Sequence, residues 1–361
     1  MGAFEGGEST NIVYCDLSKA FDCVSHEILL KKLPCYGVKS DAIELLKSYL
    51  TDRSQKTYFL TFSGHKKIEH GVPQGSLLAP LLFLIYINDI KAAVPNSTLS
   101  LFADDTALIN TDENFEELNR KTNESLQALE RWFNSNQLLL NAEKTVNITF
   151  SLKKLVVNQD IQEVKFLGVY LDPTLTFQNH IEHLAKRLSK TLYLLRRLKE
   201  LIPFTLLLQT FHGLFQSVAC YAILAWGHSC HMDRIFKQQR RALRIICGMA
   251  FREDVKEKFT ELKILTIPSR FVFESLIYAY QNQASFQTNT NFHNYNTRSA
   301  NNIRPDFIRL QKSRISSNHY CIEYFNKLPT HTKKLPLQKF KKYIKDMLIE
   351  KALYSIHCFE L

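Results

Sequence analysis

The stretch from Leu99 to Ile109 constrains this chain most, because two adjacent acidic residues interrupt an otherwise apolar sequence. The pattern predicts a strand, a tight turn and a second strand, with Asp104 and Asp105 at the tip. Two neighbouring carboxylates repel each other, and a divalent cation relieves that repulsion. The pair therefore indicates a metal platform. An ordinary hairpin turn is the alternative, since aspartate is a common turn residue.

A third carboxylate ends another apolar run. Asn11–Cys15 is predicted to form a short strand, and Asp16 follows it directly. Asp16 precedes Asp104 by 88 residues, so only the fold can bring the two together. Three carboxylates that bridge two divalent ions suit in-line attack on a phosphoryl group. One ion activates the attacking hydroxyl, and the other stabilises the leaving pyrophosphate.

A glycine-rich loop, Gly71–Ser76, opens onto a predicted apolar helix at Leu77–Ile90. Such a loop at a helix N-terminus offers backbone N–H groups to an anion, and Gln74 adds a side-chain amide beside Gly75. The alternative is that Ser76 simply caps the helix.

Phe21 lies five residues after Asp16, and a turn after the strand can fold its ring back over the same site. The alternative is that Phe21 belongs to the core and that Asp22 caps a helix at His26–Lys32.

The front half of the chain predicts an α+β fold, an antiparallel sheet with helices on one face. Apolar residues recur at helical spacing from Phe115 to Phe133. Strands are expected at Lys56–Ser63, Val146–Ser151 and Glu163–Leu171. The back half is expected to be mainly helical.

Charge is unevenly distributed. Residues 1–150 hold 14 basic and 19 acidic residues, a balance of −5, whereas residues 151–361 hold 32 and 16, a balance of +16. This asymmetry indicates that the back half holds a polyanion. Solvated helix faces rich in lysine and arginine are the alternative. The residues that we expect to bind nucleic acid lie on predicted helix faces: Arg187, Lys190, Arg234, Lys237, Arg241 and Arg244.

The eight cysteines form no C-x-x-C pair, and His228–His231 lacks the spacing of a zinc finger. We therefore expect reduced thiols and an intracellular protein of the nucleus or the cytoplasm. The longest apolar runs, Leu77–Ile87 and Ser217–Trp226, are too short to span a bilayer.

Taken together, these ordered motifs resemble the reverse transcriptases of non-LTR retrotransposons of the jockey type. The motifs that carry the resemblance are Tyr14–Asp22, Gly71–Ser76, Phe102–Asp105, Asn141–Lys144 and Phe166–Gly168. Further similarity lies around Trp226 and Arg240–Gly248, and at Asn294–Arg298 and Phe325–Pro329. The resemblance implies an RNA-directed DNA polymerase that uses Mg²⁺, with Mn²⁺ as a substitute. It also implies an RNA template, a DNA primer and deoxynucleoside triphosphates as partners. It implies no membrane and identifies no protein partner.

The resemblance also implies a role for each site residue. Asp16 and Asp104 hold the metal ions together with the Leu17 carbonyl, and Asp105 supports them. The remaining roles are proton donation to pyrophosphate by Lys144, exclusion of a 2′-hydroxyl by Phe21, a nucleotide site lined by Gln74 and Gly75, and a primer grip at Phe166, Leu167 and Gly168.

The expected domains follow from these motifs. Residues 1–172 form a reverse transcriptase palm with partial fingers at about 27–70, and residues 173–282 form a basic helical thumb. Residues 283–302 are expected to be a flexible Asn/Thr-rich linker, and residues 303–361 a small basic C-terminal region.

The chain also departs from the family. An endonuclease domain and the first part of the fingers precede the first motif in these elements, whereas 15 residues precede Asp16 here. A C-terminal Cys-Cys-His-Cys knuckle is also missing. We therefore expect a fragment of reduced activity. The alternatives are an inactive nucleic-acid-binding remnant and another palm-type nucleotidyl enzyme such as a cyclase, which the basic back half disfavours.

Overall fold

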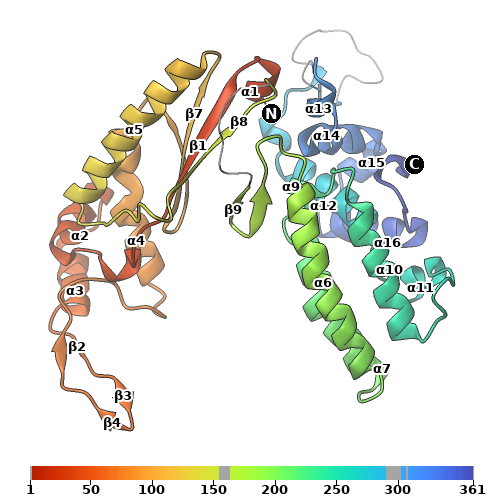
Figure 1. Cartoon of the computed structure of the whole chain (residues 1–361), viewed down its shortest axis with the longest axis horizontal. Helices are drawn as coiled ribbons and strands as arrows, with labels where there is room; N and C mark the ends of the chain where they lie inside the picture. The colour runs from red at the N-terminus through yellow and green to blue at the C-terminus, as the bar shows by residue number, and fades with distance from the viewer. Residues whose placement is uncertain (1, 154–162, 290–301, 306–307, 361) are drawn as a thin grey trace. The chain divides into compact units, whose positions relative to one another are not determined.

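The computed structural model describes residues 2–153, 163–289, 302–305 and 308–360, and it divides into two compact units (Figure 1). The sheet unit comprises Gly6–Val164. The helical unit comprises Met1–Glu5 and Lys165–Leu361.

The sheet unit alternates strands and helices. In chain order its elements are β1 (Ser9–Cys15), α2 (His26–Lys32), α3 (Ser40–Leu50), β2 (Ser54–Gln55), β3 (Tyr58–Phe59), β4 (Thr61–Phe62), β5 (Lys66–Lys67), α4 (Ala79–Ile87), β6 (Thr98–Phe102), β7 (Asp105–Asp112), α5 (Phe115–Ser135) and β8 (Val146–Phe150). Short 3₁₀ turns lie at Ala20–Asp22, Leu33–Tyr36 and Asn88–Ala93.

The main sheet has the strand order β6-β7-β1-β8, and all of its neighbouring strands are antiparallel. β1 lies inside the sheet, with Ile12 opposite both Ile109 of β7 and Ile148 of β8. Alternate residues of β1 are buried, and Val13 and Cys15 enter a core shared with α2, α4 and α5. The predicted α+β fold is therefore confirmed.

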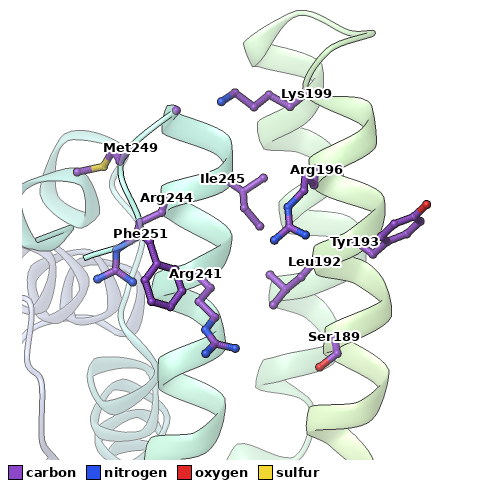
Figure 2. Close-up of a pocket in the computed structure, with 11 residues that line it drawn as sticks. Ser189, Leu192, Tyr193, Arg196, Lys199, Arg241, Arg244, Ile245, Met249 and Phe251 are labelled. Atoms are coloured by element: carbon purple, nitrogen blue, oxygen red, sulfur yellow. The ribbon is translucent and has the colours of Figure 1, made fainter. Parts of the chain in front are cut away.

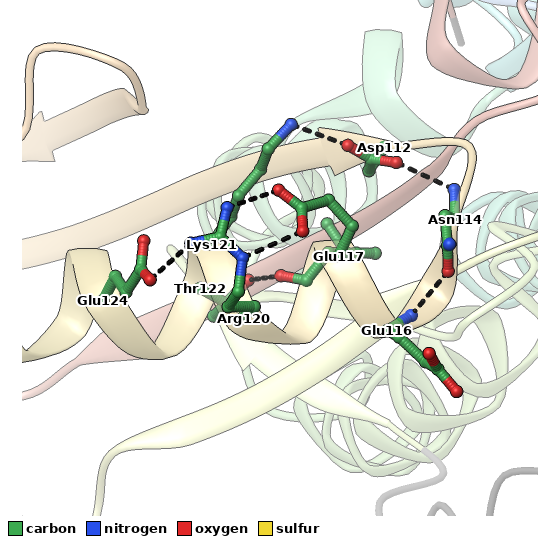
Figure 3. Close-up of polar contacts among 9 residues, drawn as sticks. Asp112, Asn114, Glu116, Glu117, Arg120, Lys121, Thr122 and Glu124 are labelled. Atoms are coloured by element: carbon green, nitrogen blue, oxygen red, sulfur yellow. Dashed lines mark hydrogen bonds and ion pairs between the residues drawn. The ribbon is translucent and has the colours of Figure 1, made fainter.

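The start of α5 is fixed by polar contacts (Figure 3). The Asn114 side chain caps the helix by accepting a hydrogen bond from the backbone N–H of Glu116 at 2.9 Å. Lys121 of α5 reaches Asp112, at the end of β7, with 2.6 Å between Nζ and Oδ2. These contacts set the direction in which the long helix leaves the sheet.

Two predicted elements are shorter than expected. The expected strand at Lys56–Ser63 is instead a hairpin of β3 and β4, because Leu60 has φ 61° and reverses the chain. The expected helix at Leu77–Ile90 is α4, which starts at Ala79, since a proline is tolerated only in the first helical turn. A 3₁₀ turn follows α4.

The helical unit begins with α1 (Gly2–Glu5) and a small hairpin, and helices form the rest. Its further elements are β9 (Val164–Phe166), β10 (Val169–Leu171), α6 (Gln178–Leu198), α7 (Phe204–Thr210), a π-turn (Phe211–Gln216), α8 (Ser217–Cys220), α9 (Ile223–Trp226), α10 (Asp233–Cys247), α11 (Lys256–Glu261), α12 (Ile267–Gln281), α13 (Gln311–Arg314), α14 (Ser317–Lys327), α15 (Thr330–Lys333) and α16 (Leu337–Lys351), with 3₁₀ turns at Gln283–Ser285 and Ile356–Cys358. Across the described ranges, each helix is too short or too polar to cross a membrane.

The C-terminal residues share one hydrophobic core with α6–α12, although the sequence predicts a separate unit at 303–361. Apolar residues of α14 and α16 enter this core, and the Thr266 hydroxyl donates to the Leu353 carbonyl at 2.6 Å. Most of the predicted linker at 283–302, and the Asn294–Arg298 motif with it, lies outside the described residues.

A buried carboxylate organises the start of α6. Asp172 accepts hydrogen bonds from the backbone N–H groups of Thr176 and Phe177 and from the hydroxyls of Thr174 and Thr176, at 2.8–3.0 Å. Burial alone raises the pKa of Asp172, but these hydrogen bonds outweigh burial and lower the pKa below its usual value. The ionised carboxylate therefore stabilises the folded helical unit.

The loop before α4 approaches the turn after β1 closely. Gly71 has φ 88°, and a Cβ added there lies 2.9 Å from the backbone of Asp22. The backbone N–H of Gly71 donates to Val24 and that of Val72 donates to Phe21, at 2.8 and 2.9 Å. Glycine is required here both for the left-handed conformation and for this contact.

We predict that Asp172→Asn destabilises the helical unit by about 1.5–3 kcal/mol at pH 7, the usual contribution of hydrogen bonds to a charged group. The folded pKa lies below the unfolded one, so the contribution is present above about pH 4 and is lost as the pH falls through the folded pKa. Urea unfolding at several pH values measures this. Asp346→Asn, on the exposed face of α16, is the control and leaves stability unchanged.

We predict that Gly71→Ala lowers the free energy of unfolding of the sheet unit by about 2–4 kcal/mol, from left-handed strain and the contact with Asp22. Gly64→Ala is the matched control, because a Cβ there meets nothing within 4 Å. Equal unfolding midpoints for both variants in urea contradict this account of the loop.

Candidate active site

Three carboxylates lie at one end of the main sheet. Asp16 directly follows β1, whose last residue, Cys15, pairs with Thr106 of β7. Asp105 begins β7 and pairs with Phe102 of β6, so Asp104 lies in the turn between these strands. The register of the sheet therefore brings all three acids to the same edge, as the sequence predicts for the hairpin and the strand end.

The charges of these acids influence one another. Partial burial raises the pKa of the Asp105 carboxyl, and the neighbouring carboxylates of Asp104 and Asp16 raise it further. Carboxylate oxygens are the ligands that hard divalent cations prefer, so the donor set fits such an ion. Within the described ranges, however, no group of three or more histidine, cysteine or acidic side chains lies close enough together to hold a metal ion in this structure.

The tip of the carboxylate hairpin is conformationally unusual. Ala103 and Asp104 form the two-residue turn, and Ala103 has φ 54°. A positive φ at the first turn position is typical of type II′ hairpins, in which glycine is preferred. The small Cβ of alanine keeps the cost of this conformation to the order of 1–2 kcal/mol.

The loop after α5 pairs with the residues that follow β1. The backbone N–H of Asn141 donates to the Asp16 carbonyl at 2.8 Å, and Ser18 donates to the carbonyl of Leu139 at 2.9 Å. This loop places Lys144 near the acids, with 3.6 Å between its Nζ and Oδ2 of Asp16. Leu17, whose carbonyl is expected to bind metal, is buried and forms a bridge with Leu140.

Phe21 packs on α4. Its ring stacks on that of Phe83, with 4.5 Å between centroids and an interplanar angle of 26°, and its side chain is half-buried. The proposed alternative role of Asp22 as a helix cap is wrong, because Ser25 caps α2 by accepting from the N–H of Ile28. Asp22 instead accepts a hydrogen bond from Gln74.

Gln74 and Gly75 lie in the glycine-rich loop as expected. Nε2 of Gln74 donates to Oδ1 of Asp22 at 3.0 Å. Gly75 has φ 87°, and the space beside it is open. The alternative role of Ser76 as a cap of α4 is wrong, since α4 begins at Ala79 without a side-chain cap. Ser76 accepts from the N–H of Leu78 and the hydroxyl of Tyr49.

The predicted primer-grip residues form the turn of the β9–β10 hairpin, whereas the sequence predicts one continuous strand at Glu163–Leu171. Leu167 and Gly168 both have positive φ, as a type I′ turn requires. The Tyr221 hydroxyl donates to the Leu167 carbonyl at 2.7 Å. Phe166, Leu167 and Gly168 thus belong to the helical unit, and the three acids belong to the sheet unit.

The basic residues expected to bind nucleic acid occupy different surroundings. Arg234 lies 3.7 Å from Glu182 and Lys237 lies 2.7 Å from Asp233, so both side chains are paired. Lys190 is exposed on α6. Arg187 lines a cavity of about 590 Å³ beside Gly168.

Arg241 and Arg244 line a cavity of about 580 Å³ between α6 and α10 (Figure 2). Arg196 and Lys199 extend toward this cavity, and the Phe251 ring lies beside Arg241. Tyr193 also lines the cavity, although its ring points outward from α6. No carboxylate lines it among the described residues. This surface combines positive charge with exposed aromatic rings, which suits a nucleic-acid backbone and its bases.

Some contacts around the site were not predicted. Asn141 acts through its backbone N–H, and His26 contacts the Gly71 carbonyl at 2.7 Å through Nε2. Neither contact has a sequence signal, because both depend on how distant loops meet. The pairing of Arg234 with Glu182 likewise depends on the fold, whereas the i,i+4 spacing of Asp233 and Lys237 in α10 is a signal that the sequence does carry.

Comparisons with known proteins find relatives of this chain among polymerases. Residues 2–171 match the family described as reverse transcriptase (RNA-dependent DNA polymerase). The probable RNA-directed DNA polymerase from transposon BS of Drosophila melanogaster is 31% identical over 276 residues, which cover 68% of this chain and 30% of that protein. The RNA-directed DNA polymerase from mobile element jockey of the same species is 25% identical, over 73% of this chain and 31% of that protein.

The chain thus spans about 30% of the length of these relatives. Among solved structures, apo telomerase from Candida tropicalis aligns with a TM-score of 0.40 at 14% identity, over 70% of this chain and 44% of that chain. Telomerase from Candida albicans, in complex with a fragment of telomeric RNA, aligns with a TM-score of 0.36 at 15% identity, over 70% of this chain and 49% of that chain.

The match over residues 2–171 includes the two strands and the turn that carry the three carboxylates. The similarity to transposon-encoded polymerases continues beyond it into the helical unit. The chain therefore belongs to the reverse transcriptases of non-LTR retrotransposons.

Proposed function

We propose that this chain catalyses RNA-directed DNA synthesis, with an RNA template, a DNA primer and deoxynucleoside triphosphates as substrates. The observation that carries the proposal is the convergence of Asp16, Asp104 and Asp105 at one edge of the sheet. Membership of the reverse transcriptase family gives this arrangement its chemical meaning.

Asp16, Asp104 and Asp105 are the proposed metal ligands, together with the Leu17 carbonyl, and Mg²⁺ is the proposed ion, with Mn²⁺ as a substitute. When bound, the ions activate the primer hydroxyl and stabilise the charge of the leaving pyrophosphate. The three carboxylates lie at the edge of the sheet beside the hairpin turn, where they are accessible to solvent. The raised pKa of the Asp105 carboxyl reflects partial burial and the repulsion between neighbouring carboxylates, which a bound cation would relieve.

Lys144 is the proposed proton donor to pyrophosphate. Its ammonium group lies beside Asp16 on an exposed loop, where a phosphate oxygen can reach it. Gln74 and Gly75 are proposed to line the nucleotide site, and the open space at Gly75 supports close approach of a ligand to the backbone. Phe21 is proposed to lie beneath the sugar.

The helical unit is proposed to act as the thumb. The Arg241–Arg244 surface, with its adjacent aromatic rings, is proposed to hold the sugar–phosphate backbone of template and primer. Phe166, Leu167 and Gly168 are proposed to position the primer end. All eight cysteines are free thiols, which supports the proposal of a reducing, intracellular location in the nucleus or the cytoplasm.

We predict that Asp104→Asn lowers primer extension at least about 100-fold, since the loss of one metal-binding carboxylate removes several kcal/mol of charge stabilisation. Extension of a DNA primer on an RNA template with Mg²⁺ or Mn²⁺ measures this. Asp41→Asn, at an exposed position in the first turn of α3, is the control. Unchanged extension by Asp104→Asn contradicts the proposed site. Binding without extension by the unaltered chain supports an inactive nucleic-acid-binding protein instead.

We predict that Phe21→Ala lowers discrimination against ribonucleotides while deoxynucleotide use changes less, because steric exclusion acts through a clash with the 2′-hydroxyl. Competition between ribo- and deoxynucleotides during extension measures this. Phe83→Ala controls for lost packing, since Phe83 is the buried partner of the Phe21 ring. Equal discrimination in Phe21→Ala and the unaltered chain indicates that Phe21 is an ordinary core residue.

A further inference from the structure

An exposed hairpin arm extends from the sheet unit between α3 and the glycine-rich loop. We call residues 53–68 the arm. Two short ladders build it: Ser54 and Gln55 pair with Lys67 and Lys66, and Tyr58 and Phe59 pair with Phe62 and Thr61. The backbone N–H of Ile68 donates to the Arg53 carbonyl at 2.9 Å and closes its base.

The tip of the arm is apolar and open to solvent. The side chains of Tyr58, Phe59, Leu60 and Phe62 are 63–83% exposed. Tyr58 and Phe62 lie on one face with 4.9 Å between ring centroids, and the alternation of the ladder places Phe59 on the other face. Exposed rings of this kind, fixed on a paired backbone, form a surface on which flat apolar groups can stack.

The charge of the arm is uniformly positive. It contains Arg53, Lys56, Lys66 and Lys67 and no aspartate or glutamate. Nζ of Lys56 lies 4.3 Å from the centroid of the Phe62 ring, so charge and aromatic surface are adjacent. A ligand that fits this arm combines negative charge with flat apolar faces.

A cavity of about 710 Å³ connects the base of the arm to the glycine-rich loop. Lys19, Arg53, Lys66 and Lys67 line it, and they outnumber the two acids in the lining, Asp22 and Glu69, so the cavity is positively charged overall. The occupant must therefore be long enough to reach from this cationic cavity to the aromatic tip. A polynucleotide strand has the length, the charge and the stacking faces that these features require.

We infer that the arm binds single-stranded nucleic acid, with phosphates at the cationic base and unpaired bases on the rings of Tyr58, Phe59 and Phe62. A duplex fits less well, because its bases are already stacked on one another. The inference concerns binding alone and does not depend on the proposed polymerase activity.

The test measures affinity of the full chain for labelled oligonucleotides of about 16 nucleotides by fluorescence anisotropy, with single-stranded RNA, single-stranded DNA and duplex RNA as separate probes. Tyr58→Ala/Phe62→Ala is expected to raise the Kd for single strands about tenfold or more, and to change the Kd for the duplex less than about twofold. Comparison of the RNA and DNA probes shows which strand the arm prefers. Tyr58→Trp/Phe62→Trp is expected to retain single-strand affinity.

Phe204→Ala, which removes an exposed ring in the helical unit, is the matched control and is expected to leave single-strand affinity unchanged. Far-UV circular dichroism and the unfolding midpoint establish that each variant is folded. Equal loss of single-strand and duplex affinity in a folded Tyr58→Ala/Phe62→Ala variant overturns the inference, as does no loss at all. Aromatic-dependent binding to phosphatidylserine vesicles, or aromatic-dependent self-association by sedimentation, with unchanged RNA and DNA affinity also overturns it.

Asp104→Asn separates the two proposals. It is expected to abolish extension and to leave the single-strand affinity of the arm intact. If the unaltered chain never extends a primer but Tyr58→Ala/Phe62→Ala lowers its affinity for single strands, the proposed role of the arm is supported and the proposed polymerase activity is refuted. If the unaltered chain extends a primer but these substitutions leave its single-strand affinity unchanged, only the proposed role of the arm is refuted.

Discussion

The pairing of β1 with β7 on one side and β8 on the other is the constraint on which the candidate site depends. Side chains alternate along a strand, so a slip of one residue turns every side chain to the opposite face. The core fixes the register, because Val13 and Cys15 are almost fully buried. Asp16, one residue further, therefore has a fixed position relative to the β6–β7 turn. Hydrophobic packing of the last residues of β1 thus positions the charge that directly follows the strand.

Backbone hydrogen bonds hold the surrounding loops to the residues after β1. The loop at Asn141 bonds to the Asp16 carbonyl, and the loop at Gly71 and Val72 bonds to the carbonyls of Val24 and Phe21. Each such bond contributes only about 1 kcal/mol, but together they align segments that lie far apart in the sequence. Because the backbone makes these contacts, the side chains of Lys144 and Gln74 stay exposed to solvent.

Strong local patterns predicted the fold well. The apolar runs that flank the Asp104–Asp105 pair and the helical spacing from Phe115 to Phe133 identified the hairpin and α5, since burial itself imposes these periods. The break at Leu60 escaped prediction, because a non-glycine residue rarely adopts a positive φ. The roles of the candidate site residues remain predictions. The sequence could not show that Arg234 is paired with an acid whereas Arg241 lines an open cavity, because the partner of Arg234, Glu182, lies on another helix.

The direction of α6 and α10 affects the basic surface between them. Arg234 of α10 meets Glu182 of α6, and Gln238 donates to the Ala185 carbonyl, so the two helices run parallel and end on the same side. Each C-terminus carries a partial negative charge of roughly half an electron from its unpaired carbonyl groups. Lys199 and Arg244 therefore face two helix dipoles as well as solvent. The electrostatic field at this surface is therefore weaker than the formal charges of its arginine and lysine side chains alone would produce.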